Sequence, residues 1–126
     1  MSALSYTHAA SILENSLRSG TYYLALFLTD PTAADNGGEV VGGGYARKQI
    51  AFSAPQLVSG KQQVANSNEV DYGVISADIG TVSYWGIYDD VTAGELKWYG
   101  AFTRARNIIA GDAITVLAGA ITCTLS

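Results

Sequence analysis

The chain has 126 residues, of which 48% are hydrophobic and only 14% are charged, and its net charge at neutral pH is −4. A domain of this size buries a sizeable core, and the hydrophobic fraction excludes an intrinsically disordered chain. The negative net charge opposes binding to nucleic acid, because the phosphate backbone is itself negative. A single cysteine and a single histidine exclude an internal disulfide and the common zinc sites.

Neither a signal peptide nor a membrane span is expected. Residues 1–8 lack the basic region and the continuous apolar run of a secretory signal. The most apolar stretch, residues 108–121, is interrupted by Asp112 and is too short to cross a bilayer. We therefore expect no membrane partner.

One segment is predicted to be helical, at about residues 7–19. Thr7 or Ser5 can supply the N-terminal capping oxygen, and Gly20 suits the left-handed residue that follows a helix. Apolar residues recur at helical spacing and form one stripe. They are Ala9, Ile12, Leu13 and Leu17.

After Gly20 the pattern changes to the period of two that is typical of strands. Residues 22–29 are apolar on both faces, which predicts a strand that is covered on both sides. Asp30 and Pro31 end this strand, because proline cannot donate to a strand ladder. Residues 33–44 contain two glycine clusters and are predicted to form a long flexible loop.

A further strand is predicted at residues 45–52. Ile50 and Phe52 face inward in this prediction, whereas Arg47 lies on the other face. Pro55 ends the strand.

The second half of the chain has the clearest alternation. Residues 82–88 and 96–102 alternate and are joined by a glycine-containing loop, which predicts an antiparallel hairpin. Towards the C-terminus the apolar positions switch from even to odd numbers, and a bulge or tight bend at Gly119 would restore the inward face. One or two short strands are also expected around Val64 and residues 69–74.

Six to eight short strands and one helix predict a mainly β fold. The expected architecture is an antiparallel β-sandwich or a flattened, jelly-roll-like barrel with one short N-terminal helix. No internal repeat or domain boundary is visible, so residues 1–126 are expected to form a single β-rich domain. Its strands would extend from about residue 21 to residue 126.

No residue pattern indicates catalysis, and no cofactor is expected. His8 is the only imidazole, and Cys123 alternates with apolar neighbours, which is typical of an inert core thiol. The adjacent Asp89 and Asp90 diverge in an extended loop, unlike the paired carboxylates of glycosidases. The spacing of a calcium-binding loop is absent, but a Ca²⁺ ion bound at the surface by acidic loop residues is an alternative.

Arginines and aromatic residues form the candidate interface. Arg104 and Arg106 point to one side of an extended segment, where they either protect a strand edge by charge or belong to a contact surface. Because so little charge is available, part of the outer face of the aromatic hairpin is expected to be buried by another subunit. Carbohydrate binding through stacked aromatic rings is a further alternative. The candidate interface residues are Arg47, Tyr84, Trp98, Arg104 and Arg106.

The order of these segments resembles a widespread family of small virion proteins of tailed bacteriophages. Members are usually labelled tail fibre protein or minor structural protein. The resemblance runs along nearly the whole chain, although the segment before Tyr22 is shorter than in the family and residues 61–72 do not align with it. The matching segments are residues 23–31, 38–52, 80–89, 96–103, 110–112 and 117–125.

The resemblance implies a non-enzymatic structural component of a phage virion. The first expectation is an external decoration or cement protein that stabilises or adorns the capsid. The alternative is a tail or tail-fibre component that acts as an adaptor or as a receptor- or glycan-binding module. Implied partners are the major capsid protein or tail proteins, further copies of the chain in a homo-oligomer and, for the alternative, a host receptor. Such a protein would be made in the host cytoplasm and then enter the virion.

Overall fold

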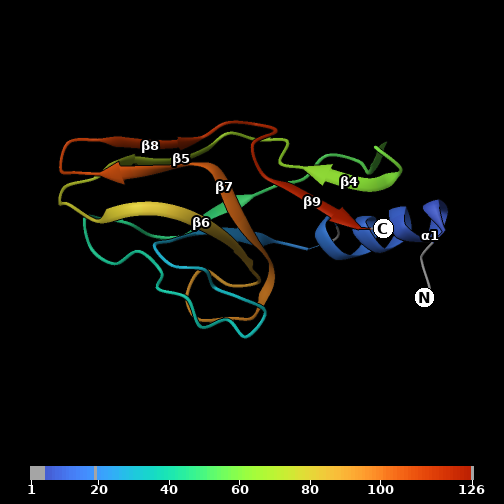
Figure 1. Cartoon of the computed structure of the whole chain (residues 1–126), viewed down its shortest axis with the longest axis horizontal. Coiled ribbons are helices and arrows are strands. Elements are labelled where there is room, and N and C mark those ends of the chain that lie inside the picture. Colours follow the sequence, from blue (N-terminus) through green and yellow to red (C-terminus); the bar gives the residue numbers. More distant parts are fainter. Residues whose placement is uncertain (1–4, 19, 126) are drawn as a thin grey trace.

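The computed structural model describes residues 5–18 and 20–125. One α-helix, α1 (Tyr6–Leu13), continues as a short π-helical turn, η1 (Glu14–Arg18), and nine strands follow (Figure 1). The strands are β1 (Tyr22–Phe27), β2 (Lys48–Ile50), β3 (Gln56–Val58), β4 (Lys61–Ala65), β5 (Val70–Val74), β6 (Gly80–Tyr88), β7 (Leu96–Ile108), β8 (Ala113–Val116) and β9 (Thr122–Leu125).

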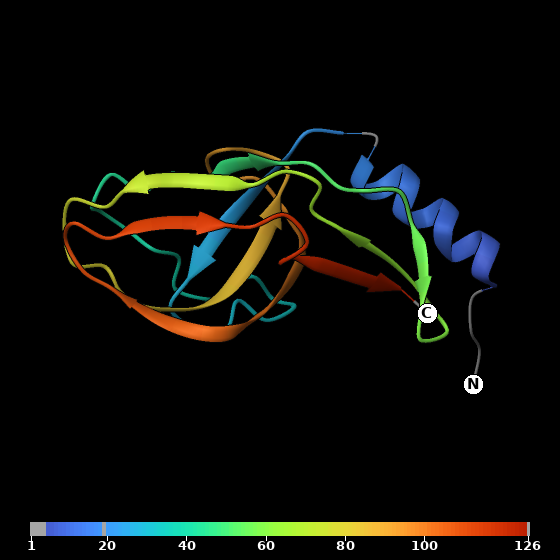
Figure 2. The same ribbon diagram turned by 90° about the horizontal axis from the view of Figure 1, so that it is seen from above.

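The strands form three antiparallel sheets. The largest has the order β2-β1-β6-β7, the second has the order β3-β4-β9, and β5 pairs with β8. The β5–β8 pair stacks on the four-stranded sheet, and the β3-β4-β9 sheet extends from this body together with α1 (Figures 1 and 2). The fold is consistent with the predicted β-sandwich, whereas the flattened-barrel alternative is not found, because the described strands close no barrel.

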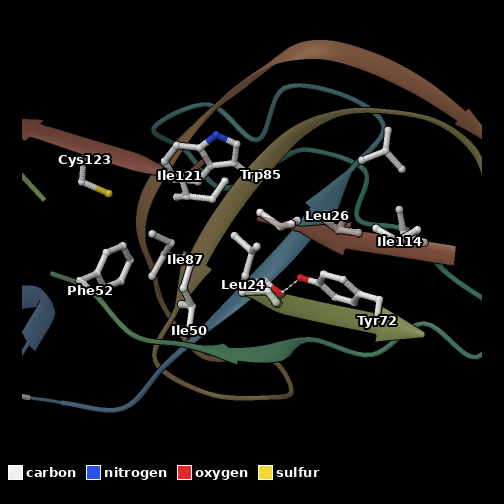
Figure 3. Packing of buried hydrophobic residues seen from close by; sticks show 14 of the residues in the cluster. Leu24, Leu26, Ile50, Phe52, Tyr72, Trp85, Ile87, Ile114, Ile121 and Cys123 are labelled. Atoms are coloured by element: carbon white, nitrogen blue, oxygen red, sulfur yellow. Dashed lines mark hydrogen bonds between the residues drawn. The ribbon is translucent and has the colours of Figure 1, made fainter. Parts of the chain in front are cut away.

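One apolar core lies between these layers (Figure 3). Leu24, Leu26 and Ile87 of the four-stranded sheet are fully buried and face side chains of the other two sheets. The Tyr72 hydroxyl of β5 donates a hydrogen bond of 2.6 Å to the Leu24 carbonyl. This bond satisfies a buried polar group between the layers, as a core of this kind requires.

The predicted helix is present, but it begins slightly earlier and changes type. Ser5 is the N-cap, since its hydroxyl accepts a hydrogen bond of 3.2 Å from the His8 amide, so Thr7 does not cap the helix. Leu13 and Leu17 of the apolar stripe are buried as predicted. Residue 19, the last of the predicted helix, lies outside the described residues.

The strand predicted at residues 45–52 is wrong in its extent. Only Lys48–Ile50 pairs with β1, and Phe52 makes an isolated bridge to Asn66. The first part is a turn instead, because the Tyr45 amide bonds to the Gly42 carbonyl. Ile50 and Phe52 are nevertheless buried, as predicted.

The remaining strand predictions are mostly confirmed. The β6–β7 hairpin forms as predicted, and β7 continues to Ile108. The switch of parity near Gly119 marks a tight bend between two strands, β8 and β9, because the Ala120 amide bonds to the Leu117 carbonyl. The three-residue strand β3 was not predicted by the alternation.

The outer face of the four-stranded sheet is covered by the chain itself. Phe27 and Tyr88 are buried there with stacked rings 6.2 Å apart. The loop after β1 lies against them, since the Tyr88 hydroxyl donates to Asp35 and Pro31 is buried. This part of the face is therefore covered without a second subunit, and burial of other parts, such as the exposed Tyr99, by another subunit stays a prediction.

No helix within the described residues is long and apolar enough to span a membrane.

Candidate interaction groove beside strand β7

Three strands end their sheets on the same side of the molecule. In the described ladders β7 pairs only with β6, β9 only with β4, and β8 only with β5. Each strand therefore presents one unpaired backbone edge. Such an edge is a template for pairing with another chain unless it is covered or charged.

Two adjoining cavities lie between these edges. The larger, of about 800 Å³, is bordered by residues 102–104 of β7 and by residues of β8 and the β8–β9 bend. The smaller, of about 390 Å³, lies between residues 98–101 of β7 and residues 122–124 of β9. Thr103, Ala120 and Thr122 line both cavities, so we treat them as one continuous groove, the β7 groove.

A large bulge in β7 shapes the groove. Val82 of β6 is opposite Arg106, but Tyr84 is opposite Ala101, so four β7 residues, 102–105, face only Ser83. These four residues have no ladder partner on β6. A bulge bends its strand and redirects its side chains, and β7 is visibly curved at this level (Figure 2).

The rim of the groove is positively charged. Arg104 is exposed and has no hydrogen-bond or ion-pair partner among the described residues. Arg106 donates one long hydrogen bond, of 3.4 Å, to the Ala113 carbonyl. The residues that line the two cavities include no carboxylate. The groove therefore favours a ligand that supplies negative charge.

Arg47 lies away from the groove and is only 9% exposed. Its Nη2 and Nε donate to the two carboxylate oxygens of Glu39 at 2.8 and 2.9 Å. Its Nη1 donates to the carbonyls of Ala93, at 2.5 Å, and Asp90, at 3.1 Å. The guanidinium also lies 3.7 Å from the centre of the Tyr88 ring. This side chain fastens the β1–β2 loop to the β6–β7 loop.

The surroundings of Arg47 raise its own pKa and the pKa values of two neighbouring phenols. Burial by itself would lower the pKa of Arg47, but the hydrogen bonds to Glu39 and the charges of Glu39, Tyr88 and Tyr45 together outweigh burial and raise it. Burial, together with the hydrogen bond to Glu39, raises the pKa of Tyr45 far above its usual value. Burial and the hydrogen bond to Asp35 likewise raise the pKa of Tyr88. Arg47 therefore stays charged, and Tyr45 and Tyr88 stay protonated, at neutral pH.

The structure brings together some of the predicted interface residues. Trp98 and Arg104 line the two halves of the β7 groove, and Arg106 lies two residues beyond Arg104. Tyr84 is half-buried against the Phe27–Tyr88 cluster on the outer face. Whether any of these residues touches a partner stays a prediction.

Sequence reasoning missed the threonines that line the groove. Thr103, Thr115 and Thr122 are exposed residues on strand edges, and their shared position follows only from the packing of sheets. The predicted alternation ends at residue 102, so it carried no signal for any of these threonines.

The described residues offer little for catalysis. They contain no group of three His, Cys, Asp or Glu side chains that would hold a metal ion. His8 is exposed in the first turn of α1. Burial raises the pKa of the Cys123 thiol to about 12, so the thiol stays protonated and unreactive at neutral pH.

The chain matches the family model Gp80, described as "Podophage GP4 fiber I protein gp80", over residues 3–124. The chain belongs to the Gp80 family. This confirms the resemblance to tailed-phage structural proteins. A Gp80 protein is by its family name a phage fibre protein, so the chain is a structural component of a phage virion. No curated protein matches the chain.

Proposed function

We propose that this Gp80 chain is a non-enzymatic building block of a phage tail fibre, which attaches to neighbouring virion proteins through the β7 groove. The family description names a fibre, and this favours the tail-fibre alternative over capsid decoration, the first expectation from the sequence. The observation that carries the proposed contact is the groove itself, where three unpaired strand edges meet.

The composition of the groove suits a protein contact. Phe102 and Trp98 pack against the core and keep part of their surface open to the groove. Arg104 supplies a charge at the rim, and arginine and aromatic residues dominate the binding energy of protein interfaces. A neighbouring strand could pair with a free edge and place its side chains against these groups.

Complementation of a phage that lacks this chain tests the proposal. Arg104→Ala should reduce the amount of chain per purified particle by about fivefold or more, because a rim contact is lost. Lys61→Ala is the matched control, since Lys61 is an exposed cation of β4 outside the groove. Equal incorporation of both variants at the wild-type level would contradict a contact through the groove.

Glycan binding is a second candidate. Tyr99 is 43% exposed and lines the smaller cavity beside Trp98, among threonine hydroxyls that can donate to sugar oxygens. A glycan array probed with the chain tests this candidate, and Tyr99→Ala should abolish any signal. An array without signal leaves the structural role as the function of the groove.

A further inference from the structure

The loop between β6 and β7, residues 89–95, forms an acidic projection that we call the 89–95 knob. All seven residues are exposed, and Val91 is an apolar residue with 47% of its surface open. Lys97 pairs with Asp89 at 3.9 Å and with Glu95 at 3.3 Å. Asp90 has no cationic partner among the described residues, so its charge is free to act on another molecule.

The knob is held in one conformation. The Glu95 amide donates to the Asp89 carboxylate at 2.8 Å and closes the loop at its base. Arg47 donates to two carbonyls within it, those of Asp90 and Ala93, and Arg47 is itself held by Glu39. A projection fixed in advance loses little conformational entropy when it binds, which favours affinity.

The knob and the β7 groove are complementary. The knob presents an apolar side chain, Val91, next to an unpaired carboxylate. The groove presents apolar Phe102 and Leu117 next to Arg104, which lacks a partner among the described residues. Leu117 is 63% exposed, so it offers surface that a partner would cover.

Within one copy the knob borders the β1–β2 loop and none of the residues that line the groove. The knob precedes β7, and Arg104 lies eight residues beyond Leu96, the first residue of that strand. Eight extended residues span up to roughly 26 Å, and the strand direction leads away from the knob. The complementary surfaces therefore lie at separate places on one molecule.

We infer that the 89–95 knob of one copy docks into the β7 groove of a second copy, with Val91 against Phe102 and Leu117 and Asp90 against Arg104. The inference rests on the proposed role of the groove and names its occupant. The two surfaces differ, so the contact is heterologous, and an open assembly keeps one free knob and one free groove until a ring closes. Arg47 then acts as a positioning residue that shapes the knob.

Charge reversal tests the contact in the isolated full-length chain by analytical ultracentrifugation at low salt. The wild type should self-associate, and 1 M salt should weaken the association, because salt screens exposed charges. Arg104→Glu or Asp90→Lys should each raise the dissociation constant about tenfold or more. The double variant should restore association, since Lys at 90 then faces Glu at 104.

Matched controls separate this contact from a general charge effect. Lys61→Glu and Glu69→Lys make the same charge changes at exposed residues outside the knob and the groove, and they should leave association unchanged. Val91→Asp probes the knob without touching its internal hydrogen bonds and should also abolish association. Circular dichroism confirms that each variant is folded.

A wild type that stays monomeric, or a double variant as dissociated as the single ones, would overturn the inference. A different result would contradict the proposed function, namely incorporation of Arg104→Ala into phage particles at the wild-type level. If Arg104→Ala is lost from particles while the isolated wild-type chain stays monomeric, the groove binds another virion protein. In that case the knob is ruled out as the occupant of the groove, and the proposed function stands.

Discussion

Arg47 shows how far a residue's role depends on contacts that are distant in the sequence. Alternation placed it opposite Ile50 and Phe52, and composition made it an interface candidate. The structure buries it against Glu39 and two carbonyls of the β6–β7 loop, more than 40 residues away. No local sequence pattern predicts these contacts, because Arg47 and the two carbonyls meet only when the β1–β2 and β6–β7 loops pack together.

Arg47→Lys should lower the free energy of unfolding by about 2–3 kcal/mol. Lysine keeps the charge but loses the two-pronged bond to Glu39 and the reach to both carbonyls, and a buried pair is costly to break. Urea denaturation followed by circular dichroism measures the change. Arg104→Lys is the matched control and should stay within about 0.5 kcal/mol of the wild type. Equal stability of both variants would contradict a structural role for Arg47.

Buried phenols and the buried thiol make stability fall at alkaline pH. Burial raises the pKa values of Tyr45 and Tyr72 well above 10, and that of Cys123 to about 12. In the unfolded chain these groups ionise near pH 8.5 to 10, whereas in the fold they stay protonated. Their stabilisation is therefore complete below that range and is lost as the pH rises above it.

Unfolding by urea at pH 8 and pH 11 checks this dependence. Each such group lowers the free energy of unfolding by up to about 1.4 kcal/mol per pH unit above its unfolded pKa. We expect tyrosinate absorbance of the native chain to lag behind that of the unfolded chain. The same stability at both pH values, with all tyrosines ionised in the fold, would contradict the buried positions.

At the scale of elements, one feature of β7 is predictable from the sequence, its hairpin with β6, and another is not, its bulge. The alternation of residues 82–88 and 96–102 was enough to predict the hairpin. The bulge at residues 102–105 was hidden, because it appears only in the register between β6 and β7, which the alternation of one strand does not fix. The free edges of β7, β8 and β9 were hidden for the same reason, since strand order depends on pairing between distant segments.

Gly100 on β7 is required by close packing. A Cβ atom at this position would lie 2.6 Å from Cζ2 of Trp85. Gly100→Ala should therefore destabilise the fold by about 1–3 kcal/mol, because Trp85 or the strand must shift. Thermal unfolding measures the change, with the exposed neighbour Ala101 changed to serine as the control. A Gly100→Ala variant as stable as that control would contradict the prediction, because Trp85 would then shift without loss of stability.

At the scale of the whole molecule, the fold class followed from composition and period, but the grouping of strands into three sheets did not. The helix, the first strand and the hairpin were each visible in local patterns. The groove lies between segments about 20 residues apart, so only the assembled fold shows it. Of the predicted interface residues, Trp98 and Arg104 line it; Trp98 lies in the part of β7 whose alternation was visible, whereas Arg104 lies in the bulge beyond it.

The molecule as a whole is a β-rich body with two proposed contact surfaces. One is the positively charged β7 groove, and the other is the acidic 89–95 knob. Its membership of a fibre family places it in the virion. The tail-fibre proposal also predicts where on the particle it lies and in how many copies.

Gold-labelled antibodies on purified phage, together with quantitative mass spectrometry of the same particles, measure both. We expect label at the tail only and a handful of copies per particle. Label spread over the capsid shell with hundreds of copies, or a chain absent from the particle, would contradict the tail-fibre assignment.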